Sequence, residues 1–153
     1  MDADLIPPTT KRVARHTDEE INERISRQTE ANVAYFAQGD RRLIRRLREL
    51  DQEWDIERVL EANAATVALA GLLLGRVINR GWFFLPAVVA SFLLQHAVQG
   101  WCPPVPMFRR LGIRTQTEID HERYALKALR GDFKKIKDDG KDGASDALKA
   151  VRA

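Results

Sequence analysis

Residues 60–101 read LEANAATVALAGLLLGRVINRGWFFLPAVVASFLLQHAVQGW, and this stretch decides the fold. Charged residues make up 31% of the chain, yet Arg76 and Arg80 are the only two between residues 62 and 101. A segment this long and this apolar can supply two helices that cross a lipid bilayer. We therefore predict an all-α protein built on a transmembrane helical hairpin.

The hairpin divides into two predicted spans, residues 60–78 and 82–101, joined by a turn at residues 79–81. As a helix, the first span is about 28 Å long, close to the hydrocarbon thickness of about 30 Å. Trp82 and Trp101 bracket the second span, which contains no charged residue. Because indoles favour the boundary between lipid and water, we expect one tryptophan in each interface.

Arginines are unevenly distributed around the two spans. Residues 41–58 contain six arginines and residues 102–123 contain four, whereas the connecting turn is flanked by Arg76 and Arg80. Lys and Arg are retained in the cytoplasm during membrane insertion. This asymmetry predicts a multi-pass protein of the bacterial inner membrane with both termini in the cytoplasm.

Amphipathic helices are predicted before the hairpin, over residues 17–54, following a flexible basic arm at residues 1–16. Thr17 followed by Glu20 is typical of a helix N-terminus. The second of these helices either lies on the membrane surface or packs on the first, and both can hold together. Its apolar face consists of Leu43, Leu47, Leu50 and Trp54.

The chain after the second span is expected to leave the membrane at once. Three prolines between residues 103 and 106 predict an extended path along the interface, which completes a hairpin unit at residues 55–115. A cytoplasmic amphipathic helix is predicted at residues 117–133, packed on the N-terminal helices. Residues 134–153 are rich in charge and predict a disordered tail, with a weak helix that forms on binding.

Gly71 and Gly75 form a GxxxG motif in the first span. Small residues at this spacing let two helix backbones approach closely. Two interpretations are open. The glycines either mediate a homodimer or face the second span of the same chain, around Ala87, Ala90 and Ser91.

Gln95 and His96 are a polar pair in the second span. A histidine within a membrane is a candidate proton relay or haem ligand. The alternative is a structural role in which the pair forms hydrogen bonds with Asn63, Thr66 or a neighbouring helix. The chain lacks a second histidine at the same depth, which favours the structural role and predicts no bound cofactor.

Cys102 is the single cysteine, so an internal disulfide is excluded, and no Cys/His spacing indicates a metal site. A thiol near Arg109 and Arg110 is a candidate for a lowered pKa, but no base or resolving cysteine accompanies it. We expect a structural residue at the membrane interface. Basic runs interleaved with acidic residues argue against nucleic-acid binding.

The segments Gly100-Trp101-Cys102-Pro103 and Leu111-Gly112-Ile113-Arg114-Thr115, placed after two short spans, resemble the YgaP-like transmembrane domain family. The resemblance covers residues 55–115 and implies a bacterial inner-membrane hairpin that is dimeric through its spans. In the name-giving member this domain is joined to a rhodanese sulfurtransferase domain. The rhodanese part is absent from this sequence, and Pro104 and Pro106 depart from the family pattern.

No residue pattern in the chain has the layout of a catalytic site. We therefore expect a non-enzymatic anchor or scaffold that binds the lipid bilayer, self-associates and holds a cytoplasmic protein partner. One alternative is an accessory subunit of a sulfur, redox or transport system, suggested by Cys102 and His96. Another is a soluble helical subunit of an oligomeric assembly, in which the apolar hairpin is buried against partners.

Overall fold

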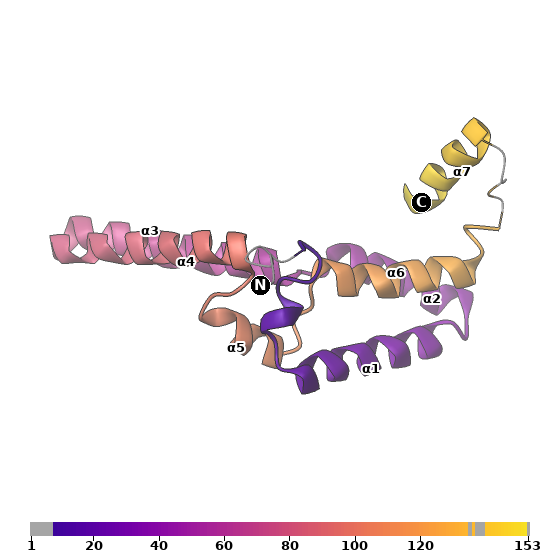
Figure 1. Ribbon diagram of the computed structural model, residues 1–153, viewed down its shortest axis with the longest axis horizontal. Coiled ribbons are helices and arrows are strands. Elements are labelled where there is room, and N and C mark those ends of the chain that lie inside the picture. Colours follow the sequence, from indigo (N-terminus) through magenta and orange to yellow (C-terminus); the bar gives the residue numbers. More distant parts are fainter. Residues whose placement is uncertain (1–7, 135, 137–139, 153) are drawn as a thin grey trace, which may run out of the picture. The chain divides into compact units, whose positions relative to one another are not determined.

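The computed structural model of the chain is built from helices (Figure 1). It describes residues 8–134, 136 and 140–152, and no β-strand occurs within these ranges. The all-α fold class and the presence of two long apolar helices are confirmed. In chain order the elements are η1 (Ala14–His16), α1 (Glu19–Phe36), α2 (Asp40–Gln52), α3 (Ile56–Val77), η2 (Arg80–Phe83), α4 (Phe84–Gln99), α5 (Pro104–Arg110), α6 (Gln116–Arg130) and α7 (Gly140–Arg152).

The chain forms two compact units. Unit 1 contains the chain up to Ile25 and Trp54–Thr115, and therefore holds α3, η2, α4 and α5. Unit 2 contains Ser26–Glu53 and the chain from Gln116 onward, with α2, α6 and α7. Helix α1 begins in unit 1 and ends in unit 2.

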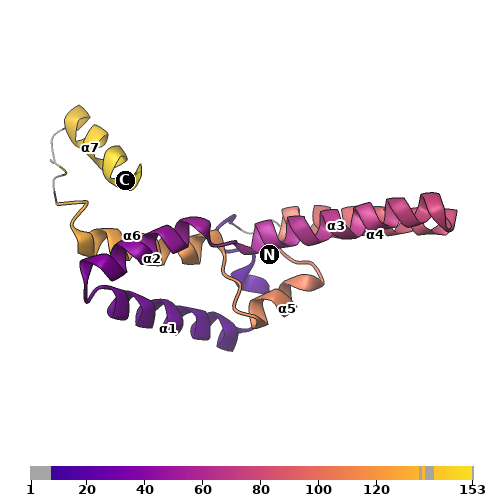
Figure 2. The ribbon, with the colours of Figure 1, turned by 180° about the vertical axis from the view of Figure 1, so that it is seen from behind.

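Helices α3 and α4 lie side by side as a hairpin (Figures 1 and 2). Asp55 caps α3 because its carboxylate accepts a hydrogen bond of 3.1 Å from a backbone N–H of the first turn. In the turn, Asn79 Oδ1 accepts a hydrogen bond of 2.7 Å from the N–H of Gly81. Gly100 ends α4 at a φ of 79°, where a Cβ would lie 2.6 Å from the backbone of Arg12.

The core of unit 1 lies at the base of the hairpin, where both helices meet the rest of the chain. Helix α3 begins at Ile56, four residues before the predicted span, because Ile56 and Leu60 are both buried in this core. The backbone N–H of Ile56 donates to the carbonyl of Arg114 at 2.9 Å and fixes the start of the helix. The other core residues are Val13, Cys102, Val105 and Phe108.

Residues 8–16 differ from the predicted flexible arm, whose first seven residues lie outside the described ranges. They form turns and η1, and Val13 is 3% exposed in the core. Thr17 does not cap α1, which begins at Glu19. Its hydroxyl instead donates to the carbonyl of Val13 at 2.9 Å. This part of the arm is packed because the side chain of Val13 is buried in the core of unit 1 and the carbonyl of Val13 accepts the hydrogen bond from Thr17.

The prediction of an extended path after the second span is wrong for residues 104–110, which form α5. Pro104 is the first residue of this helix and Pro106 the third. A proline is tolerated in the first turn because the backbone N–H groups there have no partner within the helix. The prolines at residues 103–106 therefore lie at the start of a helix, where the sequence alone predicted an extended segment.

The core of unit 2 is formed by α2 and α6. The leucine face predicted for residues 40–54 is present as Leu43, Leu47 and Leu50, and each is at most 6% exposed. These leucines pack on Ile119 and Leu126, with Val33 and Phe36 of α1 against them. Leucines at steps of three and four are buried here by protein, but their main partner is α6 and not the first helix, which the packing alternative named.

Residues 140–152 differ from the disordered tail predicted for this region. They form α7, and the carbonyl of Val151 accepts a hydrogen bond of 2.8 Å from Lys127 Nζ of α6. The rest of the predicted tail includes residues 135, 137–139 and 153, which lie outside the described ranges. The cation supports the C-terminal end of α7, where carbonyl groups lack partners within the helix.

Candidate functional site

Gly71 is buried against α4 of its own hairpin, and Gly75 is buried against η2. A Cβ on Gly71 would lie 2.8 Å from Cδ of Pro86, and a Cβ on Gly75 would lie 2.8 Å from the ring of Phe83. The structure thus shows the intramolecular alternative for the GxxxG motif, centred on Phe83 and Pro86. The face that would have mediated a homodimer is occupied within the chain.

Outside this contact, the apolar side chains of the hairpin are largely exposed. In the most apolar stretch of each candidate span, 17% and 6% of the residues are buried. A core helix of a soluble protein would be mostly buried instead. The exposed apolar residues of the hairpin include Val67, Leu69, Leu72, Leu73, Val77, Ile78, Phe84, Phe92, Leu94 and Val98.

A charged cluster of Arg12, Glu57 and His96 lies at the base of the hairpin. Glu57 Oε2 is 2.8 Å from His96 Nε2, and Glu57 Oε1 is 2.9 Å from a guanidinium nitrogen of Arg12. The other guanidinium nitrogen of Arg12 donates to the carbonyl of Ala97 at 3.0 Å. The cluster joins the N-terminal segment to both helices of the hairpin.

Glu57 is held in its charged form by this cluster. Burial raises the pKa of the carboxyl group, but hydrogen bonds and charges from His96 and Arg12 outweigh burial, so the net pKa is lowered. His96 is 4% exposed, and its Nδ1 has no hydrogen-bond partner among the described residues. A half-buried carboxylate and a buried histidine are thus paired at one end of the hairpin.

The expected partners of Gln95 and His96 are not the ones observed. Asn63 and Thr66 each donate to a carbonyl four residues earlier in α3, at 2.8 Å and 2.7 Å. The side chain of Gln95 is half-buried and forms no hydrogen bond within the described residues. The observed partner of His96 is Glu57, and the sequence contained a signal for this pair. Glu57 is near the start of α3 and His96 is near the end of α4, and these two ends lie together when the helices are antiparallel.

Cys102 is 3% exposed in the core of unit 1. Burial raises the pKa of the thiol, and the negative charge of Glu57 raises it further against a hydrogen bond from Val105. The candidate lowering of the pKa by Arg109 and Arg110 is therefore contradicted. Cys102 lines an apolar cavity of about 250 Å³ between α3 and α4, together with Leu60 and Pro103. A raised pKa and burial are typical of a structural cysteine.

Arg109 is 0% exposed and holds α5 to the N-terminal segment of unit 1. Its guanidinium group donates to Thr17 Oγ1 at 3.2 Å, Asn22 Oδ1 at 2.9 Å and the carbonyl of Ile113 at 3.1 Å. Sequence reasoning counted Arg109 merely as a positive charge beside the membrane. No local pattern identifies such an arginine, because its partners are far away in the sequence.

The tryptophans stand near the two ends of the hairpin. Trp82 is 43% exposed at the turn, and Trp101 is half-buried directly after Gly100. A third tryptophan, Trp54, is exposed just before α3, and the guanidinium carbon of Arg58 lies 4.3 Å from its ring centre. Their placement in membrane interfaces stays a prediction.

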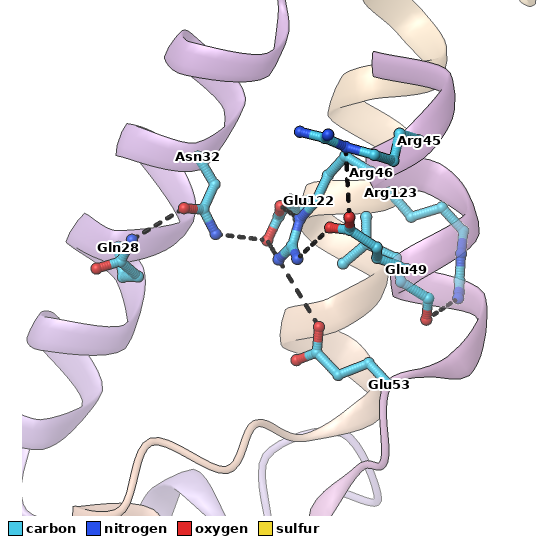
Figure 3. A network of polar contacts seen from close by, with 9 residues as sticks. Gln28, Asn32, Arg45, Arg46, Glu49, Glu53, Glu122 and Arg123 are labelled. Atoms are coloured by element: carbon cyan, nitrogen blue, oxygen red, sulfur yellow. Dashed lines mark hydrogen bonds and ion pairs between the residues drawn. The ribbon is translucent and has the colours of Figure 1, made fainter. Parts of the chain in front are cut away.

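Unit 2 contains a polar network around Glu122 (Figure 3). Glu122 is 0% exposed, and its carboxylate accepts hydrogen bonds from Arg46 at 2.7 Å and 3.2 Å and from Asn32 at 3.3 Å. Burial lowers the pKa of Arg46, but Glu122, Glu53 and Glu49 together outweigh burial and the net pKa is raised. Arg123 of α6 donates to the carbonyl of Leu50 at 3.0 Å. These contacts fix α2 and α6 in register.

Comparisons with protein-family models, curated proteins and solved structures find no match. The functional interpretation therefore depends on the geometry of the hairpin and of unit 2. Within the described residues, no group of three or more His, Cys, Asp or Glu side chains is suited to hold a metal ion.

Proposed function

We propose that α3 and α4 insert into a membrane and that the chain is a non-enzymatic anchor that places unit 2 at the cytoplasmic surface. The observation that carries this proposal is the exposed apolar surface of the hairpin. Each apolar side chain left in water costs free energy in proportion to its exposed area, whereas a lipid bilayer removes this cost.

The lengths and charges of the two helices support insertion. Helix α3 has 22 residues, and this length corresponds to about 33 Å, slightly more than the hydrocarbon thickness of about 30 Å. The charged groups of the hairpin lie at its two ends, with Arg76 and Arg80 at the turn and Glu57 paired with Arg12 at the base. Charges at these depths can reach the headgroup layer.

The arginine distribution supports an orientation with both termini in the cytoplasm and the turn outside. Unit 2 contains five of the six arginines in residues 41–58, and so it belongs on the side where basic residues are retained. The proposed membrane is the bacterial inner membrane, because the sequence resembles the YgaP-like hairpin family. Self-association in this proposal uses a surface other than Gly71 and Gly75, since these contact Pro86 and Phe83 of the same chain.

The two alternative functions make different demands on the chain. A redox or transport subunit needs a reactive group, but Cys102 is buried with a raised pKa. An anchor therefore tolerates Cys102→Ser without loss of function in the cell. A soluble oligomer needs a protein partner over the whole exposed face of α3 and α4, and such a chain is soluble without detergent.

The first prediction concerns insertion and topology, tested in a Cys102→Ser background so that every label reports an introduced thiol. Single cysteines are placed by Asn79→Cys in the turn and Lys149→Cys in α7. We expect the chain to stay in the membrane pellet after carbonate extraction. We also expect an impermeant maleimide to label Asn79→Cys in intact cells and Lys149→Cys after lysis. Release of the chain into the supernatant would contradict insertion, and the reverse labelling would contradict the orientation.

A further inference from the structure

A cavity of about 390 Å³ lies in unit 2 between α2, α6 and the C-terminal end of α7. Its volume is within the range of small-molecule binding sites. Ile44 and Leu47 of α2 and Tyr124 of α6 supply apolar and aromatic surface. Among the described residues, Asp51 is the one acidic residue in the cavity lining. Five cationic side chains also line the cavity: Arg48, Arg123, Lys127, Arg130 and Arg152.

Two of the five cations are neutralised by carboxylates of unit 2. Arg123 forms ion pairs with Asp51 at 3.2 Å and with Asp120. Arg130 forms an ion pair with Asp132, and this contact raises the pKa of the arginine. Among the described residues, no carboxylate forms an ion pair with the other three, Arg48, Lys127 and Arg152. The cavity therefore has excess positive charge contributed by all three helices.

Lys127 is the cation most enclosed by protein, with an exposed fraction of 6%. Its ammonium group has three N–H donors, and within the described residues it forms one hydrogen bond, to the carbonyl of Val151. It also lies 6.0 Å from the ring centre of Tyr124. A buried ammonium group with unused donors is costly unless an acceptor completes its shell. The cavity beside it is where such an acceptor fits.

We propose that this cavity binds an anionic phosphate group, contacted by Lys127 from α6, Arg48 from α2 and Arg152 from α7. Guanidinium groups bind phosphate oxygens in pairs, and an ammonium group adds a compact charge, so this combination suits a phosphate better than a single carboxylate. The phosphate belongs either to a lipid headgroup or to a soluble phosphate compound. The lipid source depends on the proposed membrane insertion, whereas phosphate binding itself does not.

The chain connectivity is compatible with a headgroup. Helix α2 ends at Gln52 and α3 begins at Ile56, so Arg48 is few residues away from the proposed membrane helix along the chain. The cavity volume also leaves room for a glycerol group beside the phosphate. Bound phosphate would join α7 to both α2 and α6, whereas the Lys127–Val151 hydrogen bond joins α7 to α6 alone.

The second prediction tests this site with the full chain in phosphatidylcholine nanodiscs and follows amide hydrogen exchange of residues 140–152. One arm adds inorganic phosphate at constant ionic strength, and the other replaces part of the lipid with phosphatidic acid. We expect saturable protection of α7 in at least one arm. Protection by inorganic phosphate indicates a soluble ligand, and protection confined to phosphatidic acid nanodiscs indicates a headgroup.

The matched variants carry equal changes of charge on the same two helices. Arg48→Gln with Arg152→Gln removes two exposed cations of the cavity, and we expect the apparent affinity to fall about tenfold or more. Arg41→Gln with Lys149→Gln leaves the cavity lining intact and is expected to change the affinity less than about twofold. Absence of protection in both arms, or equal loss in the two double variants, overturns the proposal.

Discussion

At the scale of single residues, the chain buries charges in both units, and two of them form hydrogen bonds with side chains distant in sequence. Arg109 in unit 1 and Glu122 in unit 2 are both 0% exposed. A buried charge is tolerated where hydrogen bonds and an opposite charge replace water, and removal of one partner leaves the other without compensation. These residues therefore determine how precisely the helices are aligned.

The third prediction concerns Arg46 and its neighbour Arg45. Arg46→Met keeps the aliphatic stem but leaves buried Glu122 without its guanidinium partner, and we expect the free energy of unfolding of unit 2 to fall by about 3 kcal/mol. Arg45→Met breaks an exposed pair with Glu49 and should cost less than about 1 kcal/mol. Hydrogen exchange of the α6 amides in denaturant measures both values. Equal losses in the two variants would show that burial of Glu122 is unimportant.

The fourth prediction is a pH dependence set by Glu57. Its pKa in the folded chain is below the ordinary value of 4.5. The stabilisation it provides is therefore complete above about pH 4.5 and is lost as the pH falls through the lowered folded pKa. We expect amide protection of residues 8–17, joined to Glu57 through Arg12, to fall in this acidic range.

Two variants isolate the contribution of Glu57. Glu57→Gln should reduce protection of residues 8–17 at neutral pH and remove the additional acid-induced loss. Glu61→Gln changes an exposed carboxylate one turn further along α3 and should behave as the unmodified chain. The same acid-induced loss in Glu57→Gln would assign the effect to other groups.

At the scale of helices, the hairpin depends on close approach of α3 to α4 at Gly71 and to η2 at Gly75. The fifth prediction compares Gly75→Val with Ala70→Val. A larger side chain at Gly75 would meet the ring of Phe83, and such overpacking should cost about 1–3 kcal/mol. Ala70 is exposed on the same helix, so its replacement should have little effect.

Thermal denaturation in detergent and the oligomeric state, measured together, distinguish the two possible roles of the glycines. A lower melting temperature for Gly75→Val with an unchanged oligomeric state agrees with packing inside one chain. Dissociation of an oligomer by Gly75→Val, with the melting temperature of each subunit retained, would show that the motif acts between chains.

Helix boundaries show which local signals are dependable. Apolar segments predicted α3 and α4, and leucines at helical spacing predicted the buried face of α2, because both features depend on residues close in sequence. The prolines before α5 were misread because proline disfavours the interior of a helix but fits its first turn. Helix α7 was predicted only as a weak helix, over residues 145–151 of a disordered tail, because its packing on Lys127 comes from a distant part of the chain.

At the scale of the whole molecule, averages conceal the division of the chain. The mean hydropathy of −0.36 resembles that of a soluble protein, yet the hairpin exposes apolar side chains along its length. Between residues 62 and 101 the charged residues are Arg76 and Arg80, whereas the segments on either side are rich in charge. The chain therefore separates an apolar hairpin from charged segments that form ion pairs.

The sequence by itself determined that the chain is helical, that two helices are long and apolar enough for a membrane, and where the turn between them lies. These properties follow from hydrophobic content and spacing over short segments. Tertiary structure decided the partners of Gly71, His96 and Glu122 and the enclosure of Lys127. A sequence motif indicates which contacts a residue can form. The packing of distant segments selects one of these contacts, because burial and charge pairing depend on residues that the fold brings together.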